Sequence, residues 1–273
     1  GIINISCKYL IHMSEISIIQ NFVCNSKKRF EMIEDNIPNM ARIFNPCPII
    51  VNYDTDNYDI EIYSLYKKHF ENLTFNIGDN EDWATTTYKL LSYTDSPYIC
   101  YVCEDIIFDP TFTKQQFNGV FEEYKKHNCS HLHMGRVQKY LTHTSDWLKK
   151  MNKGNYIYFG HCSKVKYKTL SLDGLFKRDL FESALKHTIG KGNGIIGMDA
   201  FEYRIKIRLQ NIICAIPVDY WFTECNGRCA ILERIHSQNT PEYKNKWRPH
   251  WSSKLKSKPH PEAVEQRASD IIL

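Results

Sequence analysis

The length and charge of this chain already narrow its class. Its 273 residues suffice for one large α/β domain or two small ones. The 35 basic and 31 acidic residues leave a formal charge of +4, too small an excess to indicate a nucleic-acid-binding protein. No run of 18 apolar residues occurs, so no transmembrane helix is expected within the chain. Several of the ten cysteines lie in apolar runs, as reduced thiols do in cytosolic proteins, and we expect a cytoplasmic protein.

The first half of the chain predicts alternating strands and helices. Short apolar runs indicate strands, and apolar residues three or four positions apart indicate helices. The expected strands are 16–24, 49–51, 73–77 and 98–103, and the expected helices are 27–43, 60–70 and 81–93. Asp79 or Asn80 is the expected N-cap of the third helix. This order predicts a mostly parallel sheet with right-handed crossovers.

The second half is less regular and predicts a small antiparallel portion. The expected helices are 112–127, 179–187 and 198–211, and the expected strands are 131–134, 156–159 and 212–218. A loop with four glycines spans 190–197. His131 and His133 alternate along what we expect to be a half-exposed edge strand, where two histidines alone do not indicate a metal site. The predicted fold class is α/β, with a mostly parallel sheet flanked by helices.

Two adjacent carboxylates follow the strand at 98–103. This strand is apolar or aromatic throughout, which suits a central strand covered on both faces. Glu104 and Asp105 come next, and in open α/β sheets ligands bind outside the carboxyl ends of the strands. Paired carboxylates can hold a hard divalent cation, and the cation can hold a diphosphate. The alternative is that the two acids only begin a loop.

Polar residues also follow the other expected strands. Asn25 and Arg29 come just after the first strand, with Lys27 and Lys28 beside them, where a positive group could meet an anionic ligand. Asp54 closes the second strand. Asp199 follows the glycine-rich loop at the start of a helix, and its alternative role is that of an N-cap alone. In a parallel sheet these residues belong at one edge.

Four segments, taken in chain order, resemble those of GT-A fold glycosyltransferases, inverting nucleotide-sugar enzymes similar to family 2. Segment 17–24 resembles the opening strand that cradles the nucleotide, and 49–54 resembles the second strand, whose terminal acid accepts a hydrogen bond from the base. Segment 98–105 resembles the strand with the metal-binding D-x-D motif. Segment 197–209 resembles the helix start that carries the general base. The match spans roughly residues 16–240.

The resemblance implies roles for seven residues. Asp199 would be the catalytic general base. Asp105 would contact a divalent cation, Mn²⁺ or Mg²⁺; His236 would bind the same ion, unless it is an exposed histidine after a strand. The implied donor-binding residues are Asp54, Asn25, Arg29 and Glu104. The family pattern is broken at two positions: Cys103 replaces the first acid of D-x-D, and Met198 stands where many relatives have a second acid beside the base.

The implied reaction moves a sugar from a UDP or dTDP type of donor to a hydroxyl of a glycan or glycoconjugate acceptor. Two alternatives stay open. A sugar-phosphate nucleotidyltransferase would share the sheet and the metal, but residues 24–29 lack the glycines of its phosphate loop. A non-catalytic carbohydrate-binding domain would explain Cys103 as a lost metal ligand.

We expect one GT-A domain over residues 1–243 and a basic extension over 244–273. The nucleotide-binding half is placed at about 16–110 and the acceptor-binding half at about 111–243. The extension carries Trp247 and Trp251 among basic residues. It could contact an anionic membrane surface, although a solvated extension wrapped on the domain is the favoured interpretation. The abundance of Ile, Asn and Lys suggests an AT-rich genome, as in many bacteria and large viruses.

Overall fold

The fold is described from a computed structural model of the chain. The described residues are 14–23, 27–54, 58–77, 81–103, 106–108, 111–133, 149–162, 172–192, 197–198, 200–201, 212–219 and 222–224. Among these residues, no helix is both long and apolar enough to cross a membrane. The expected extension at 244–273 lies outside the described residues.

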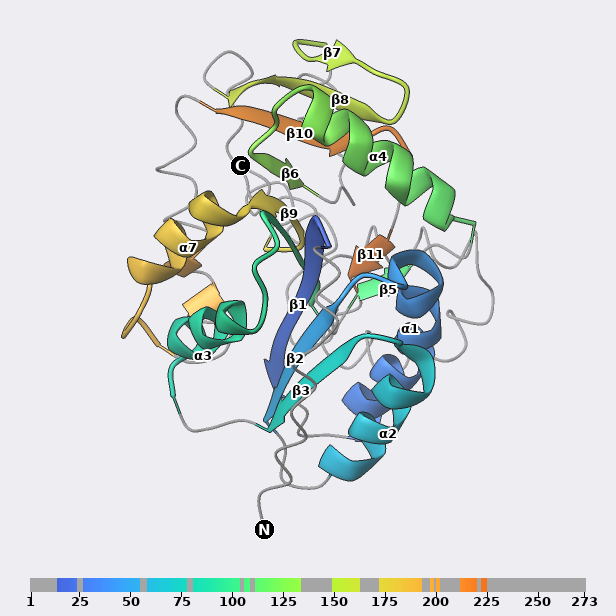
Figure 1. Cartoon of the computed structure of the whole chain (residues 1–273), viewed down its shortest axis with the longest axis vertical. Coiled ribbons are helices and arrows are strands. Elements are labelled where there is room, and N and C mark those ends of the chain that lie inside the picture. The colour runs from blue at the N-terminus through green and yellow to red at the C-terminus, as the bar shows by residue number, and fades with distance from the viewer. Residues whose placement is uncertain are drawn as a thin grey trace, which may run out of the picture.

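Nine strands of the described residues form one twisted sheet, in the order β3-β2-β1-β4-β9-β6-β10-β8-β7 (Figure 1). Their bounds are β1 Ile16–Val23, β2 Ile49–Asp54, β3 Leu73–Ile77, β4 Tyr98–Tyr101, β6 His131–His133, β7 Asn152–Lys153, β8 Ile157–His161, β9 Gly174–Lys177 and β10 Ile213–Pro217. A separate antiparallel ribbon pairs β5, Ile106–Phe108, with β11, Phe222–Glu224. The predicted α/β class is therefore confirmed.

The first half of the sheet is parallel and the second half is mixed. Strand β1 runs parallel to β2 and β4, and β2 runs parallel to β3. Strand β9 lies antiparallel between β4 and β6, so β4 and β6 point the same way. Strand β10 is parallel to β6, while β8 and β7 complete the sheet in antiparallel fashion. The carboxyl ends of β1, β2, β3, β4 and β6 consequently face one edge of the sheet.

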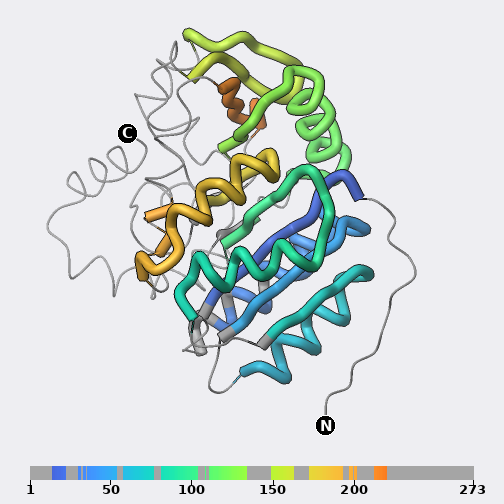
Figure 2. The backbone as a smooth tube through the Cα atoms, turned by 60° about the vertical axis from the view of Figure 1, so that its left-hand side comes forward, coloured from blue at the N-terminus to red at the C-terminus, as the bar shows by residue number. Residues whose placement is uncertain are grey.

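Helices cover both faces of the sheet. The elements are α1 Lys27–Phe44, α2 Asp59–His69, α3 Trp83–Leu90, the 3₁₀ turn Leu91–Tyr93, α4 Lys114–Lys126 and α7 Arg178–Lys186. Helices α1, α2 and α4 lie on one face, and α3 and α7 lie on the other (Figures 1 and 2). Successive residues of β1 enter opposite cores: Ile18 packs with the α1 side, and Ile19 packs with Trp83 of α3. Two buried faces explain why most residues of the strand are apolar.

Two expectations about helix starts are wrong. The N-cap of α3 is Asp82, not Asp79 or Asn80, because its carboxylate accepts the backbone N–H groups of Ala84 and Thr85, each at 3.2 Å. Burial alone would raise the pKa of the Asp82 carboxyl, but hydrogen bonds from Thr85, from the Gly190 backbone and from Ala84 outweigh burial and lower the pKa. Helix α7 begins one residue earlier than expected, so Asp179 lies in its first turn.

The strand with the two histidines is central, not at an edge. Strand β6 pairs with β9 on one side and with β10 on the other. His131 and His133 are therefore fully buried rather than half exposed. The error arose because the sequence did not indicate β9, the short strand that covers this side of β6.

The buried thiols expected from the sequence are present. Six cysteines of the described residues are free, and four of them are buried. Burial raises the pKa of Cys129 to about 12 and raises that of Cys214 further. These thiols therefore stay neutral and unreactive in the core.

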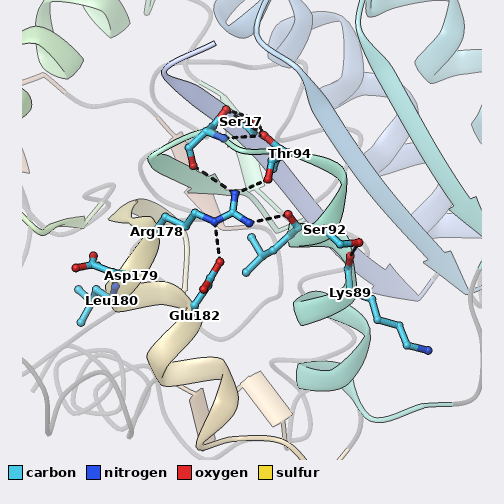
Figure 3. A network of polar contacts seen from close by, with 10 residues as sticks. Ser17, Lys89, Ser92, Thr94, Arg178, Asp179, Leu180 and Glu182 are labelled. Atoms are coloured by element: carbon cyan, nitrogen blue, oxygen red, sulfur yellow. Dashed lines mark hydrogen bonds and ion pairs between the residues drawn. The ribbon is translucent and has the colours of Figure 1, made fainter. Parts of the chain in front are cut away.

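Arg178 fixes α7 to the amino edge of the sheet (Figure 3). Its guanidinium donates to the carbonyl oxygen of Leu91 at 2.8 Å and to that of Thr94, while its Nε pairs with Glu182 at 2.6 Å. The Thr94 hydroxyl also contacts the Ser17 hydroxyl of β1 at 2.7 Å. This polar network holds the start of β4, at the edge of the sheet opposite to the carboxyl ends of the parallel strands.

Candidate active site

The ends of the first, second and fourth strands meet at the carboxyl edge of the sheet, as the sequence predicted. Asp54, the last residue of β2, lies in register beside Val23, the last residue of β1. Tyr101 ends β4 beside Ile19, and the Val102 N–H then donates to the Ile19 carbonyl at 3.1 Å. These strand ends therefore share the edge at which α/β sheets bind ligands.

A ladder of asparagine side chains crosses this edge. Asn21, Asn52 and Asn76 are register partners on β1, β2 and β3. Asn76 Nδ2 donates to Asn52 Oδ1, and Asn52 Nδ2 donates to Asn21 Oδ1, each at 2.9 Å. Asn21 Nδ2 in turn donates to the Trp83 carbonyl at 3.1 Å and to the Thr87 hydroxyl at 2.8 Å. The ladder thus ties three strand ends to the first turns of α3.

Replacing the central member, Asn52→Ala, should destabilise the protein by about 2 to 4 kcal/mol, because it removes the donor to the buried Asn21 Oδ1 and the acceptor of the partly buried Asn76 Nδ2. Urea unfolding measures this loss. The control is Asn155→Ala, an exposed asparagine whose contact with Glu123 uses the backbone N–H, and it should cost under about 0.5 kcal/mol. Equal losses in both variants would show that the ladder contributes little.

An aromatic pair joins α3 to the end of β4. Trp83 Nε1 donates to the Tyr101 hydroxyl at 3.2 Å, and that hydroxyl donates to the Asn21 carbonyl at 3.0 Å. All three residues are buried. Tyr101 reads in the sequence as one more apolar residue of the strand, so its polar contact was not foreseen.

The glycine-rich loop packs against the same start of α3. A Cβ added to Gly197 would lie 2.5 Å from the Gly192 carbonyl oxygen and 2.9 Å from the Trp83 Cβ, so only glycine fits there. Phe201 is buried, with its ring 5.6 Å from that of Trp83 and 5.1 Å from that of Phe181. Residues 197–198 and 200–201 are helical. The helix start predicted to carry Asp199 is therefore anchored on both sides at this edge.

One carboxylate at the edge was missed by the sequence analysis. Asp173 directly precedes β9 and is only 2% exposed. Its Oδ1 accepts the backbone N–H of Cys103 at 2.6 Å, at the start of the acidic segment. Recognising β9 in the sequence would have placed Asp173 beside the end of β4.

The predicted site residues themselves fall mostly outside the described part of the chain. Asp54 is placed through its backbone in β2, and Arg29 through its backbone in α1. Asn25, Glu104, Asp105, Asp199 and His236 lie outside the described residues. In the portion that is described, no three His, Cys, Asp or Glu side chains form a group that could hold a metal ion. The roles of these seven residues stay predictions.

Comparison with known proteins gives structural matches only. No family model and no curated protein sequence matches the chain. The crystal structure of residues 1–349 of TarS from S. aureus matches with a TM-score of 0.55 and 11% identity, over 85% of this chain and 68% of that one. The same fragment in complex with UDP-GlcNAc matches with a TM-score of 0.53 and 10% identity, over 94% and 71%.

TarS is a glycosyltransferase of the GT-A type. This chain has a GT-A fold. The longer TarS structure matches with a TM-score of 0.53 and 10% identity, over 85% of this chain but only 41% of that one. The GT-A fold thus accounts for most of this chain and for about two fifths of the longer relative. At such low identity the likeness establishes architecture, and activity must be argued from the sheet edge.

Proposed function

We propose that the chain is a glycosyltransferase that moves a sugar from a nucleoside diphosphate donor to an acceptor hydroxyl, with inversion at the anomeric carbon. The observation that carries the proposal is the convergence of the ends of β1, β2 and β4 with the anchored helix start at 197–201. In a GT-A sheet this edge supplies the binding site for the nucleobase, an acidic segment and the residue that acts as general base. TarS, which shares the fold, has crystal structures in complex with UDP and with UDP-GlcNAc, and each matches this chain with a TM-score of 0.53.

The side chains of the acidic segment carry the kind of ligand atoms that a hard cation prefers. Glu104 and Asp105 follow the end of β4 and offer carboxylate oxygens, the ligands that Mg²⁺ and Mn²⁺ prefer. With His236 as a further ligand, they would hold a cation, which when bound would neutralise the charge that develops on the leaving diphosphate. Asn25, Arg29 and Asp54 would bind the rest of the donor, and the glycan acceptor would approach from the 197–201 side.

The protein's own contribution to the reaction is a positioned base. Inversion requires deprotonation of the acceptor hydroxyl as it attacks the anomeric carbon. Asp199 would accept that proton. A carboxylate at a helix N-terminus is stabilised in its ionised form by the helix dipole and the free N–H groups.

A panel of nucleotide sugars tests the proposal. Each would be incubated with the protein in Mn²⁺ or in EDTA, and release of a nucleoside diphosphate would be measured. Slow donor hydrolysis in Mn²⁺ is expected of a glycosyltransferase. Formation of pyrophosphate and a nucleotide sugar from a nucleoside triphosphate and a sugar 1-phosphate would indicate a nucleotidyltransferase instead. Sugar binding without turnover of any donor would indicate a carbohydrate-binding domain.

The nucleobase of the donor is predicted to be uracil or thymine. Asp54 ends β2 beside the tip of β1, so its carboxylate would accept the imide N–H of either base. A purine presents a different edge. Calorimetry should therefore give tighter binding of UDP or dTDP than of GDP, by about tenfold or more for one charged hydrogen bond. Tighter binding of GDP would overturn this assignment.

A further inference from the structure

A buried carboxylate holds the first residue of the acidic segment. Asp173 Oδ1 accepts the Cys103 N–H at 2.6 Å. Asp173 is 2% exposed. Burying a carboxylate is costly unless hydrogen bonds compensate it, and the Cys103 N–H supplies one such bond.

The contact lies where the strand ladder stops. The pairing of β4 with β9 ends at Tyr101 and Gly174. Beyond that pair, Val102 is still held by β1, through its N–H to the Ile19 carbonyl at 3.1 Å. Cys103 is the next residue, and its N–H bonds to the Asp173 side chain instead of to a strand. The Asp173 side chain therefore extends the contact between the β9 segment and β4 from Tyr101 to Cys103, the residue before Glu104.

The sheet does not need this bond for its own completion. Strand β4 is paired on both sides through Tyr101, and its opposite end is held by the network around Arg178 and Thr94 (Figure 3). What the Asp173 contact adds is a fixed position for the backbone N–H of Cys103.

We propose that Asp173 is a positioning residue, which fixes the backbone of Cys103, the residue before Glu104 and Asp105, and thereby supports cation-dependent binding of the donor diphosphate. This inference rests on the proposed function of Asp105. It assigns Asp173 no contact with the donor. Its effect is expected on cation-dependent binding of the nucleotide and not on binding of the nucleotide alone.

The test compares Asp173→Ala and Asp173→Asn with the wild type. UDP affinity is measured by calorimetry in Mn²⁺ and in EDTA, and the exchange rate of the Cys103 amide is measured by NMR. Asp173→Ala removes the acceptor, so it should speed exchange and weaken Mn²⁺-dependent binding by about tenfold or more, while binding in EDTA changes by less than about threefold. Asp173→Asn retains a weaker oxygen acceptor and should lose only about threefold in Mn²⁺.

The matched control is Ser96→Ala, at the opposite end of β4. Ser96 is buried, and its hydroxyl donates to the Ser14 carbonyl at 2.6 Å. This variant should lower the urea midpoint but leave the ratio of affinities in Mn²⁺ and EDTA unchanged, because it loosens the sheet far from the acidic segment. If Ser96→Ala also changed this ratio, the ratio would report general destabilisation rather than a local effect of Asp173, and the inference would fail.

The outcomes separate the inference from the proposed function. Mn²⁺-dependent binding in the wild type with no loss in Asp173→Ala would reject the inference alone. Equal UDP affinity of the wild type in Mn²⁺ and in EDTA would reject the cation site and the inference together. If Asp173→Ala does not fold, Asp173→Asn decides: faster Cys103 exchange with a threefold loss in Mn²⁺ supports the inference, and faster exchange with unchanged affinity overturns it.

Discussion

Asp105→Asn is expected to abolish sugar transfer and to weaken UDP binding in Mn²⁺. Asp105 is the acid that matches the metal-contacting position of the family motif, and an amide is a poorer ligand than a carboxylate for Mn²⁺ or Mg²⁺. Neutralisation of the leaving diphosphate is worth several kcal/mol, so the transfer rate should fall by about 10³-fold or more. Steady-state transfer and calorimetry with UDP measure the two effects separately.

Cys103→Ala is the matched control for this prediction. The contact of Cys103 with Asp173 is made by its backbone N–H, which alanine retains. The thiol itself is half-buried beside both cores, so its loss should be mild for transfer and for UDP binding. Full activity of Asp105→Asn, or of the wild type in excess EDTA, would contradict the metal assignment.

The parallel part of the fold could be predicted because each of its elements carries a strong local signal. Strands β1, β2 and β4 are buried on both faces, so they appear in the sequence as mostly apolar runs with few polar residues. Helix α1 shows the apolar periodicity of a helix packed on a sheet. Parallel pairing then follows from the strand and helix alternation, and with it the meeting of the strand ends at one edge.

The parts that could not be predicted depend on contacts between distant segments. Strand β9 is four residues long and contains Gly174, so neither its length nor its composition distinguishes it from a loop. Without it, β6 lacks a neighbour, and the burial of His131 and His133 cannot be foreseen. The asparagine ladder is similar: Asn21 and Asn52 read as interruptions of apolar strands until the register places them side by side.

The candidate site divides in the same way. The convergence of the strand ends was predicted from local patterns, and the structure confirms it. Asp173 was missed because its partner Cys103 lies 70 positions away in the sequence. The seven residues given roles by the family resemblance stay predictions, since their side chains are not among the described ones. Substitution of these residues, with measurement of donor binding and sugar transfer, therefore tests their roles.

The largest kinetic effect apart from the metal site is expected at the general base. Gly197 fits against Gly192 and Trp83 without space for a Cβ, and Phe201 is buried against Trp83, so the backbone on both sides of Asp199 is anchored. An anchored helix start keeps a carboxylate in one place, which a general base requires. Asparagine has nearly the same size and shape as aspartate, so Asp199→Asn should fold and bind UDP normally.

The expected result for Asp199→Asn is a fall in kcat of about 10² to 10⁴-fold with little change in donor affinity, because the variant loses proton acceptance and nothing else. Transfer to an acceptor and hydrolysis of the donor are measured in parallel. Hydrolysis should survive better, since water needs less help than a positioned sugar hydroxyl. Asp95→Asn, at an exposed aspartate near the amino edge of the sheet, is the control and should transfer normally. Near wild-type transfer by Asp199→Asn, or a product that keeps the donor's anomeric configuration, would exclude an inverting mechanism with this base.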